Sequence, residues 1–174
     1  MSRPCVLSKE LRTIYVTGEL TEVTVASFRR AMAKLNRHKG KITVEICSEG
    51  GDVDAGFAMV DTIRTSRNPV KTVASCQVMS AAVIVLAAGH ERVSLQNTNI
   101  MVHQGSFKIV GTYSEIVRGD MPMIKRAEKE YSVMLEKFTG KAASFWDKMW
   151  SNHQVYLTAQ EAKSLNLIDK VLEW

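Results

Sequence analysis

The chain has 174 residues, of which 45% are hydrophobic and 24% are charged, and its formal net charge is +5. This length and apolar content suit one compact domain with a sizeable core. The basic residues are interspersed with acidic ones and no basic motif alternates with aromatic residues, which argues against a nucleic-acid partner.

The first half of the chain alternates β-branched segments with amphipathic ones. Residues 13–17, 42–47 and 70–74 are rich in β-branched side chains and are predicted strands. Apolar residues recur every three or four positions in residues 25–35 and 53–63, which predicts a helix after each of the first two strands. This alternation indicates βαβ units around a mainly parallel sheet.

A helix that is apolar on every side is predicted at residues 79–88, after a polar turn at residues 75–77. Such a helix has no face for water, so we expect it to be buried in the middle of the core. Two short strands are then expected, at residues 92–94 and 100–102.

The C-terminal part begins with a long amphipathic helix, residues 113–138. Pro122 lies inside this helix, and because a proline removes one helical hydrogen bond we expect a bend at residues 119–122. The remaining predicted elements are helices at residues 145–149 and 159–165 and a strand at residues 167–172.

Three segments that contain candidate catalytic residues follow predicted strands. They are the turn at residues 48–51, which contains Gly50 and Gly51, then Ser80, and then His103. The carboxyl ends of parallel strands meet at one edge of a sheet, and ligands bind there. We therefore expect these segments to gather in one place.

Ser80 can be interpreted in two ways. Serine is a favoured N-cap, and capping is the common role of a serine before an apolar helix. A hydroxyl at this position also suits a nucleophile, because the free N–H groups and the dipole of the helix stabilise an oxyanion. The amide of Ala81 would then be one oxyanion donor, and a glycine of the pair at residues 50–51 would supply the other.

His103 also has two interpretations. A lone histidine often bonds a backbone carbonyl, but this one could accept the Ser80 proton as a general base. No G-x-S-x-G motif surrounds Ser80, which argues against an ordinary α/β-hydrolase, and no phosphate-binding glycine motif is present.

The three cysteines, Cys5, Cys47 and Cys76, form no C-x-x-C pair and predict neither a disulfide framework nor a zinc site. Residues 1–12 lack the apolar stretch of a secretory signal, and the longest apolar run, residues 81–88, is far shorter than the roughly 20 residues of a membrane span. We expect a cytoplasmic protein with no membrane association, no metal and no cofactor.

Several short motifs occur in an order that resembles the proteolytic subunit of the Clp protease, and the likeness runs from about residue 14 to residue 172. The motifs are E-G-G-D-V-D-A-G at residues 49–56, M-S-A-A at 79–82, L-A-A-G at 86–89, M-V-H-Q at 101–104, Y-L-T-A-Q-E-A at 156–162 and L-I-D at 167–169.

This resemblance implies an α/β fold, a crotonase-like spiral of ββα units with a projecting handle helix. The whole chain, residues 1–174, would be one domain with a short N-terminal segment at residues 1–12. Its head would comprise residues 13–104 and 140–174, and its handle residues 105–139.

The same resemblance implies a serine endopeptidase with Ser80 as nucleophile, His103 as base, and the amides of Gly51 and Ala81 as the oxyanion hole. Residues 105–112 would form a strand that pairs with the peptide substrate. Members of the family form heptameric rings, commonly paired, which degrade unfolded polypeptides supplied by an AAA+ unfoldase.

The sequence departs from the family at the third triad position, where Gln154 replaces an aspartate. A neutral amide can accept a hydrogen bond from the imidazole but brings no charge, and loss of that charge in a known triad lowers the rate about 10⁴-fold. Asn152, Asp147 or a water molecule are alternative partners. In addition, the short segment before the first strand weakens the case for an unfoldase, and Pro122 in the handle could alter or prevent ring pairing.

Two alternative functions therefore stay open. The first is a catalytically silent ring subunit that keeps the serine without using it, which Gln154 favours. The second is a crotonase-like enzyme acting on acyl-CoA thioesters, since that superfamily shares the spiral architecture and a two-amide oxyanion hole.

Overall fold

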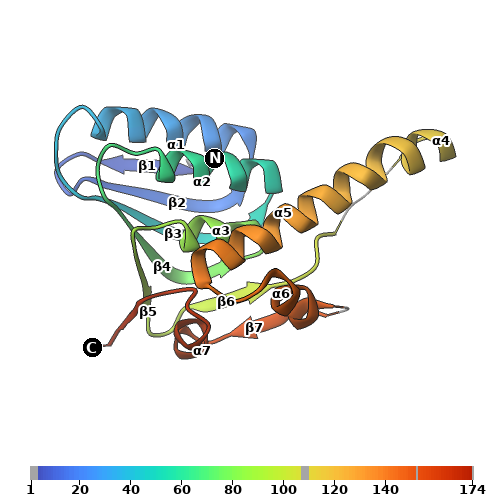
Figure 1. Cartoon of the computed structure of the whole chain (residues 1–174). Helices are drawn as coiled ribbons and strands as arrows, with labels where there is room; N and C mark the ends of the chain where they lie inside the picture. The colour runs from blue at the N-terminus through green and yellow to red at the C-terminus, as the bar shows by residue number, and fades with distance from the viewer. Residues whose placement is uncertain (1–3, 107–109, 152, 174) are drawn as a thin grey trace.

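The computed structural model describes residues 4–106, 110–151 and 153–173. Figure 1 shows a twisted sheet, a row of helices packed against it, and one long helix that projects from the rest. The strands are β1 (Cys5–Ser8), β2 (Thr13–Leu20), β3 (Ile42–Gly51), β4 (Val70–Met79), β5 (Glu91–Leu95), β6 (Asn99–Val102), β7 (Val155–Leu157) and β8 (Lys170–Leu172). The helices are α1 (Glu22–Leu35), α2 (Val53–Arg64), α3 (Ala81–Ala87), α4 (Tyr113–Glu115), the π-helical segment η1 (Ile116–Asp120), α5 (Met121–Thr139), α6 (Ala143–Trp150) and α7 (Ala159–Ser164).

The sheet is mainly parallel, as predicted. Its order is β1-β2-β3-β4-β5-β8, and β6 pairs with both β4 and β7. Antiparallel pairing joins β1 to β2 and β6 to β7, while β2, β3, β4 and β5 run parallel to one another. Helices connect most of the parallel strands, which confirms the α/β class with its crossover connections.

Strand β4 passes through the segment that we predicted to be a polar turn. Its first half pairs with β5, at Lys71 to Ala74, and its last three residues pair with β6 instead. Between the two, Cys76 has a φ of 58°, and the pairing with β3 shifts register. The prediction of a turn at residues 75–77 was wrong, because these polar residues form a bulge that redirects a strand without ending it.

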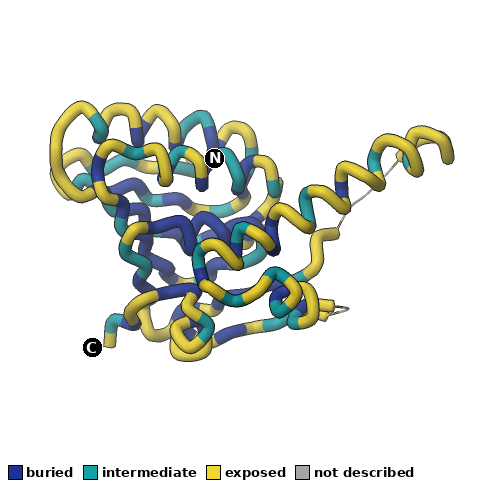
Figure 2. Tube along the Cα trace, in the orientation of Figure 1, coloured by how far each residue is buried: buried dark blue, intermediate teal, exposed yellow. Residues whose placement is uncertain are grey.

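The helices form a row in which α1 contacts α2, α2 contacts α3, and α3 contacts α5. Helix α3 lies in the middle of this row and every one of its residues is buried, as the apolar pattern predicted. Figure 2 shows this buried centre in dark blue, with exposed turns on α1 and on the projecting helix. The N-terminus of α3 is therefore held rigidly by packing on all sides.

The projecting helix is continuous through α4, η1 and α5, and it corresponds to the expected handle (Figure 1). Pro122 lies in the first turn of α5, and the irregularity expected from this proline takes the form of the π-helical segment just before it, where the hydrogen-bond register changes. The buried residues of α5 are Ile124, Tyr131, Ser132, Leu135 and Thr139, so its C-terminal half packs on the head.

The sequence analysis did not predict β1 and β7, and it placed the start of β8 too early in the chain. β1 and β7 are short strands whose only pairing partners are β2 and β6, respectively, so their local pattern is weak. β8 begins at Lys170 rather than at Leu167, because the Leu167 amide donates to the Ala162 carbonyl (2.9 Å) and closes the end of α7.

Candidate active site

Ser80 lies between β4 and α3 in a conformation that few non-glycine residues adopt. Its φ is 52° and its ψ is −129°, outside the regions that L-residues favour. It occupies the N-cap position of α3, but its side chain makes no capping hydrogen bond. The capping interpretation therefore does not describe this serine, and strain of this kind is common at functional sites.

Three hydrogen bonds hold the Ser80 backbone in place. The Ser80 amide donates to the Met101 carbonyl of β6 at 2.8 Å. The Ser80 carbonyl accepts from the Val83 amide at 2.9 Å and from the Tyr131 hydroxyl of α5, also at 2.9 Å. A strand, a buried helix and the projecting helix thus all contribute to positioning this residue.

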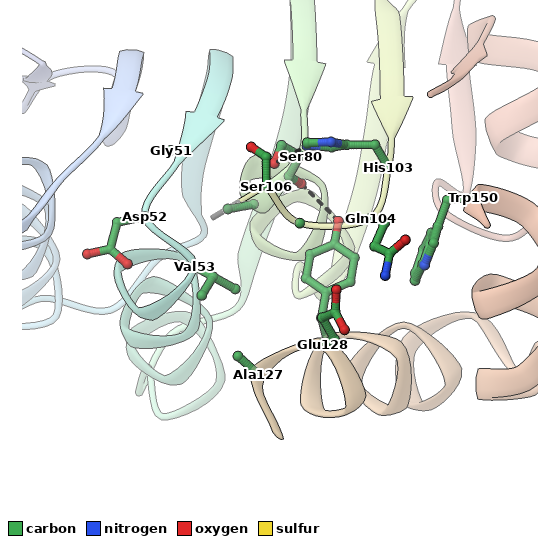
Figure 3. A pocket seen from close by; sticks show the side chains of 13 residues that line it. Gly51, Asp52, Val53, Ser80, His103, Gln104, Ser106, Ala127, Glu128 and Trp150 are labelled. Carbon is green, nitrogen blue, oxygen red and sulfur yellow. Dashed lines mark hydrogen bonds between the residues drawn. The ribbon is translucent and has the colours of Figure 1, made fainter. Parts of the chain in front are cut away.

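The bond to Met101 places Ser80 beside His103, which follows directly after β6. The His103 Nε2 and Ser80 Oγ atoms lie 2.8 Å apart, in hydrogen-bond contact (Figure 3). Burial lowers the pKa of His103 below its ordinary value, because it disfavours the charged imidazolium. The imidazole is therefore held mainly neutral at pH 7, in the state that accepts a proton from a hydroxyl.

The two glycines before α2 are the end of β3 rather than a separate turn, which corrects our prediction for residues 48–51. They have φ values of 93° at Gly50 and 139° at Gly51. A Cβ on Gly50 would lie 2.7 Å from the Ser80 Cβ, so only glycine leaves room for the serine. The Ser48 hydroxyl accepts from the Gly50 amide (3.0 Å) and donates to the Gly18 carbonyl (2.6 Å), which fixes this glycine segment.

One pocket of about 270 Å³ is lined by the predicted nucleophile, base and oxyanion residues, namely Ser80, His103, Gly51 and Ala81 (Figure 3). The remaining lining residues are Asp52, Val53, Gln104, Gly105, Ser106, Ala127, Glu128, Tyr131 and Trp150. Residues from two different elements, Gly51 at the end of β3 and Ala81 at the start of α3, therefore line the same pocket as the serine and histidine.

The candidate third residues are placed differently. Val102 pairs with Val155 in the antiparallel ladder of β6 and β7, so position 154 is the next one across from His103. The Gln154 side chain, however, accepts a hydrogen bond from the Tyr156 hydroxyl (3.0 Å). Asp147 accepts one from the Ser132 hydroxyl of α5, and Asn152 lies outside the described residues. Within the described ranges, no carboxylate contacts His103.

The sequence analysis gave no functional role to two residues of this pocket, Tyr131 and Glu128. Tyr131 belongs to the apolar stripe of the long amphipathic helix, and its hydroxyl reaches the Ser80 carbonyl. Glu128 lies on the same helix face and was not singled out. The signal available for it was a charge at a position where the stripe predicts an apolar residue.

Comparison with known proteins identifies the group to which these features belong. The family model described as Clp protease matches residues 6–174. The chain belongs to the Clp protease family. It is also 33% identical over 168 residues to the ATP-dependent Clp protease proteolytic subunit 2 of Borreliella burgdorferi, a match that covers 93% of this chain and 83% of that protein.

The fold of this Clp protease family member matches that of solved relatives. A structure of a ClpP1 mutant from Listeria monocytogenes superposes with a TM-score of 0.85, with 24% identity, over 95% of this chain and 93% of that one. This likeness, together with the family match, confirms the predicted fold class.

The resemblance also predicted a substrate-binding strand in this Clp protease family member. The strand predicted at residues 105–112 is absent from residues 105, 106 and 110–112, and residues 107–109 lie outside the described part of the chain. A peptide-binding strand here therefore stays a prediction.

Neither a metal cluster nor a membrane span is found in the parts of this Clp protease family member that the structure describes. No group of three or more metal-ligating His, Cys, Asp or Glu side chains occurs within residues 4–106, 110–151 and 153–173. None of the helices formed by these residues has the length and hydropathy to cross a membrane.

Proposed function

We propose that this chain is a serine endopeptidase in which Ser80 is the nucleophile and His103 the general base. The observation that carries the proposal is the 2.8 Å contact between Ser80 Oγ and His103 Nε2, at the start of a buried helix, and burial lowers the pKa of His103, which favours the neutral ring. The constrained serine backbone and the adjacent glycine segment support it, because together they supply nucleophile, base and oxyanion donors in one pocket.

The reaction follows from this arrangement. As Ser80 Oγ attacks the carbonyl carbon of a peptide bond, its proton passes to His103 Nε2. The negative charge that develops on the carbonyl oxygen is stabilised by the amides of Gly51 and Ala81 and by the dipole of α3. The imidazolium then gives its proton to the leaving amine, and an acyl-enzyme forms on Ser80. A water molecule attacks this acyl-enzyme as His103 accepts its proton, and His103 returns that proton to Ser80 Oγ as the acid product leaves.

The proposed substrates are unfolded polypeptides, cleaved inside a chamber formed by a homo-oligomeric ring, a heptamer or a pair of heptamers. Membership of the Clp protease family supports this assembly. The term ATP-dependent in the name of the Borreliella relative supports partnership with an AAA+ unfoldase. Free cysteines, Cys5, Cys47 and Cys76, are compatible with the reducing cytoplasm, where we propose the protein acts.

The proposal is tested by labelling the folded protein with a fluorophosphonate. We expect one label per chain on Ser80, no label on Ser80→Ala, and slow labelling of His103→Asn. Native mass spectrometry of the same sample measures the number of chains in the assembly. Absence of label on Ser80 in an assembled wild-type sample would refute the enzymatic proposal.

A second candidate is a catalytically silent ring subunit, and one specific observation favours it. Position 154 lies across from His103 but holds an amide that is bonded to Tyr156, so the imidazolium formed during catalysis has no described carboxylate beside it. Peptide hydrolysis by wild type and by Gln154→Asp separates the two candidates. Activity in wild type supports the peptidase, whereas activity in the variant alone supports the silent subunit.

A further inference from the structure

Glu128 is a charged residue on the inward face of the projecting helix. It lies one turn from buried Ile124 and one turn from buried Tyr131 and Ser132, at a position where the amphipathic pattern of α5 predicts an apolar residue. The side chain is half-buried. Burying part of a carboxylate is unfavourable unless a donor or a cation compensates for the lost water, so a residue of this kind needs a partner.

Glu128 has no such partner within the described residues. Its carboxylate forms no hydrogen bond and no ion pair there, although Lys125 and Lys129 are its neighbours on the same helix. Exposed Glu130, on another face of α5, is by contrast paired with Arg126 at 2.7 Å. Within the described residues, α5 thus supplies a cation to the outward carboxylate of Glu130 and none to the inward carboxylate of Glu128.

The free carboxylate lines the pocket that also contains Ser80 and His103. Figure 3 shows Glu128 on the α5 side of this pocket, across from the serine and histidine. Among the described residues that line the pocket, none is a lysine or arginine, although the chain as a whole has a net charge of +5. The described lining carries the carboxylates Asp52 and Glu128, which favours a cationic occupant.

The other walls of the pocket define the shape of that occupant. Val53, Ala127 and Trp150 also line the pocket and provide apolar and aromatic surface in it. A lysine or arginine side chain matches this combination, because its aliphatic stem packs on apolar and aromatic surface while its charged end reaches an acidic group.

We infer that Glu128 selects polypeptide segments with a lysine or arginine next to the cleaved bond. This inference rests on the proposed function, because it takes the pocket as the site of a peptide. Glu128 is then a specificity-determining residue that binds the substrate side chain and takes no part in bond breaking.

The test measures binding separately from hydrolysis. Fluorescent peptides that differ at one position, lysine or norleucine, are titrated into Ser80→Ala, and binding is followed by fluorescence polarisation. Norleucine keeps the straight aliphatic stem of lysine and lacks the ammonium group. We expect the lysine peptide to bind about tenfold more tightly, as for a hydrogen bond to a charged group, and the difference to shrink at high salt.

Two further substitutions in the Ser80→Ala background identify the group responsible. Glu128→Gln should abolish the difference between the two peptides, and Glu128→Lys should make a glutamate peptide the tighter ligand. Glu130→Gln is the matched control, because it removes a carboxylate from an exposed position of α5 and should leave the difference unchanged.

Equal binding of both peptides to Ser80→Ala, or a difference that survives Glu128→Gln, would overturn the inference. Hydrolysis of the same peptides by the wild-type chain reports on the proposed function by itself. Charge-selective binding without hydrolysis would refute the peptidase and keep the role of Glu128. Hydrolysis of the lysine and norleucine peptides at equal rates would support the peptidase and refute the role of Glu128.

Discussion

The hydroxyl of Tyr131 donates a hydrogen bond of 2.9 Å to the main-chain carbonyl of Ser80, across 51 positions of the sequence. Tyr131 lies on the projecting helix α5, and its ring packs edge-on against Trp150 of α6, with the ring centroids 5.5 Å apart. Burial raises the pKa of Tyr131, so its hydroxyl stays protonated and remains a donor at every physiological pH. The handle helix is thereby coupled directly to the candidate nucleophile.

Replacing Tyr131 with phenylalanine should therefore lower both stability and reactivity. The Ser80 carbonyl keeps its bond from Val83, so we expect a loss of about 1 kcal/mol in the free energy of unfolding. The strained Ser80 backbone also loses one constraint, which should reduce the rate of fluorophosphonate labelling. Urea denaturation and labelling kinetics measure the two effects.

Tyr113→Phe is the control for this change, because it removes the same hydroxyl from an exposed position at the start of the projecting helix. It should alter neither quantity. A Tyr131→Phe protein that labels at the wild-type rate would show that the hydrogen bond only supports the fold.

Gln154→Asp should accelerate labelling and hydrolysis by about tenfold or more. The register of β6 and β7 puts position 154 across from His103, so a carboxylate there can stabilise the imidazolium that forms as Ser80 attacks. It should also raise the pKa of His103, because a nearby negative charge favours the protonated ring.

Gln96→Asp is a suitable comparison for this gain, since it adds the same charge at an exposed position between β5 and β6. The rate constants for labelling and hydrolysis are measured for both variants, and only Gln154→Asp should exceed wild type. An unchanged rate in Gln154→Asp would mean that the side chain at this position keeps its contact with Tyr156 and does not turn toward the histidine.

The pH dependence of the reaction should reflect the lowered pKa of His103. Only the neutral imidazole accepts the Ser80 proton, so the rate falls as pH decreases through the pKa of this group. Because burial holds that pKa below the ordinary 6.5, we expect the half-maximal labelling rate below pH 6.5 and a rate above half of the maximum at pH 7. Labelling rates between pH 4.5 and 8 give the midpoint, and a midpoint above 6.5 contradicts this assignment.

Gly50→Ala should be damaging even though it adds a single methyl group. With φ at 93°, an alanine is strained there, and its Cβ would lie 2.6 Å from the Met79 carbonyl and 2.7 Å from the Ser80 Cβ. We expect a loss of about 2 kcal/mol or more in stability, and loss of Ser80 labelling.

Gly119→Ala makes the same chemical change where a Cβ meets nothing within 4 Å. In this helical position we expect unchanged labelling and a stability equal to or slightly above that of wild type. Thermal unfolding of both variants distinguishes the local strain at Gly50 from a general sensitivity to added methyl groups. Equal melting temperatures for the two would contradict the argument.

Local patterns in the sequence predicted the central part of the architecture of this protein. The alternation of β-branched segments with amphipathic helices predicted a parallel sheet, and the apolar run after Ser80 predicted a helix that is buried throughout, as α3 is. The order of short motifs indicated the Clp protease family. These features could be predicted because hydrophobic periodicity and glycine placement depend on residues close together in the chain.

Tertiary structure decided everything that depends on register and packing. The contact between Ser80 and His103 spans 23 positions, and the position of residue 154 opposite His103 requires β7, a strand too short to predict. The bulge at Cys76 continues a strand where the polar residues indicated a turn. Only the packing of α5 on the head shows that Tyr131 reaches Ser80 and that Glu128 faces the pocket, because the energies that orient these side chains come from residues far away in the sequence.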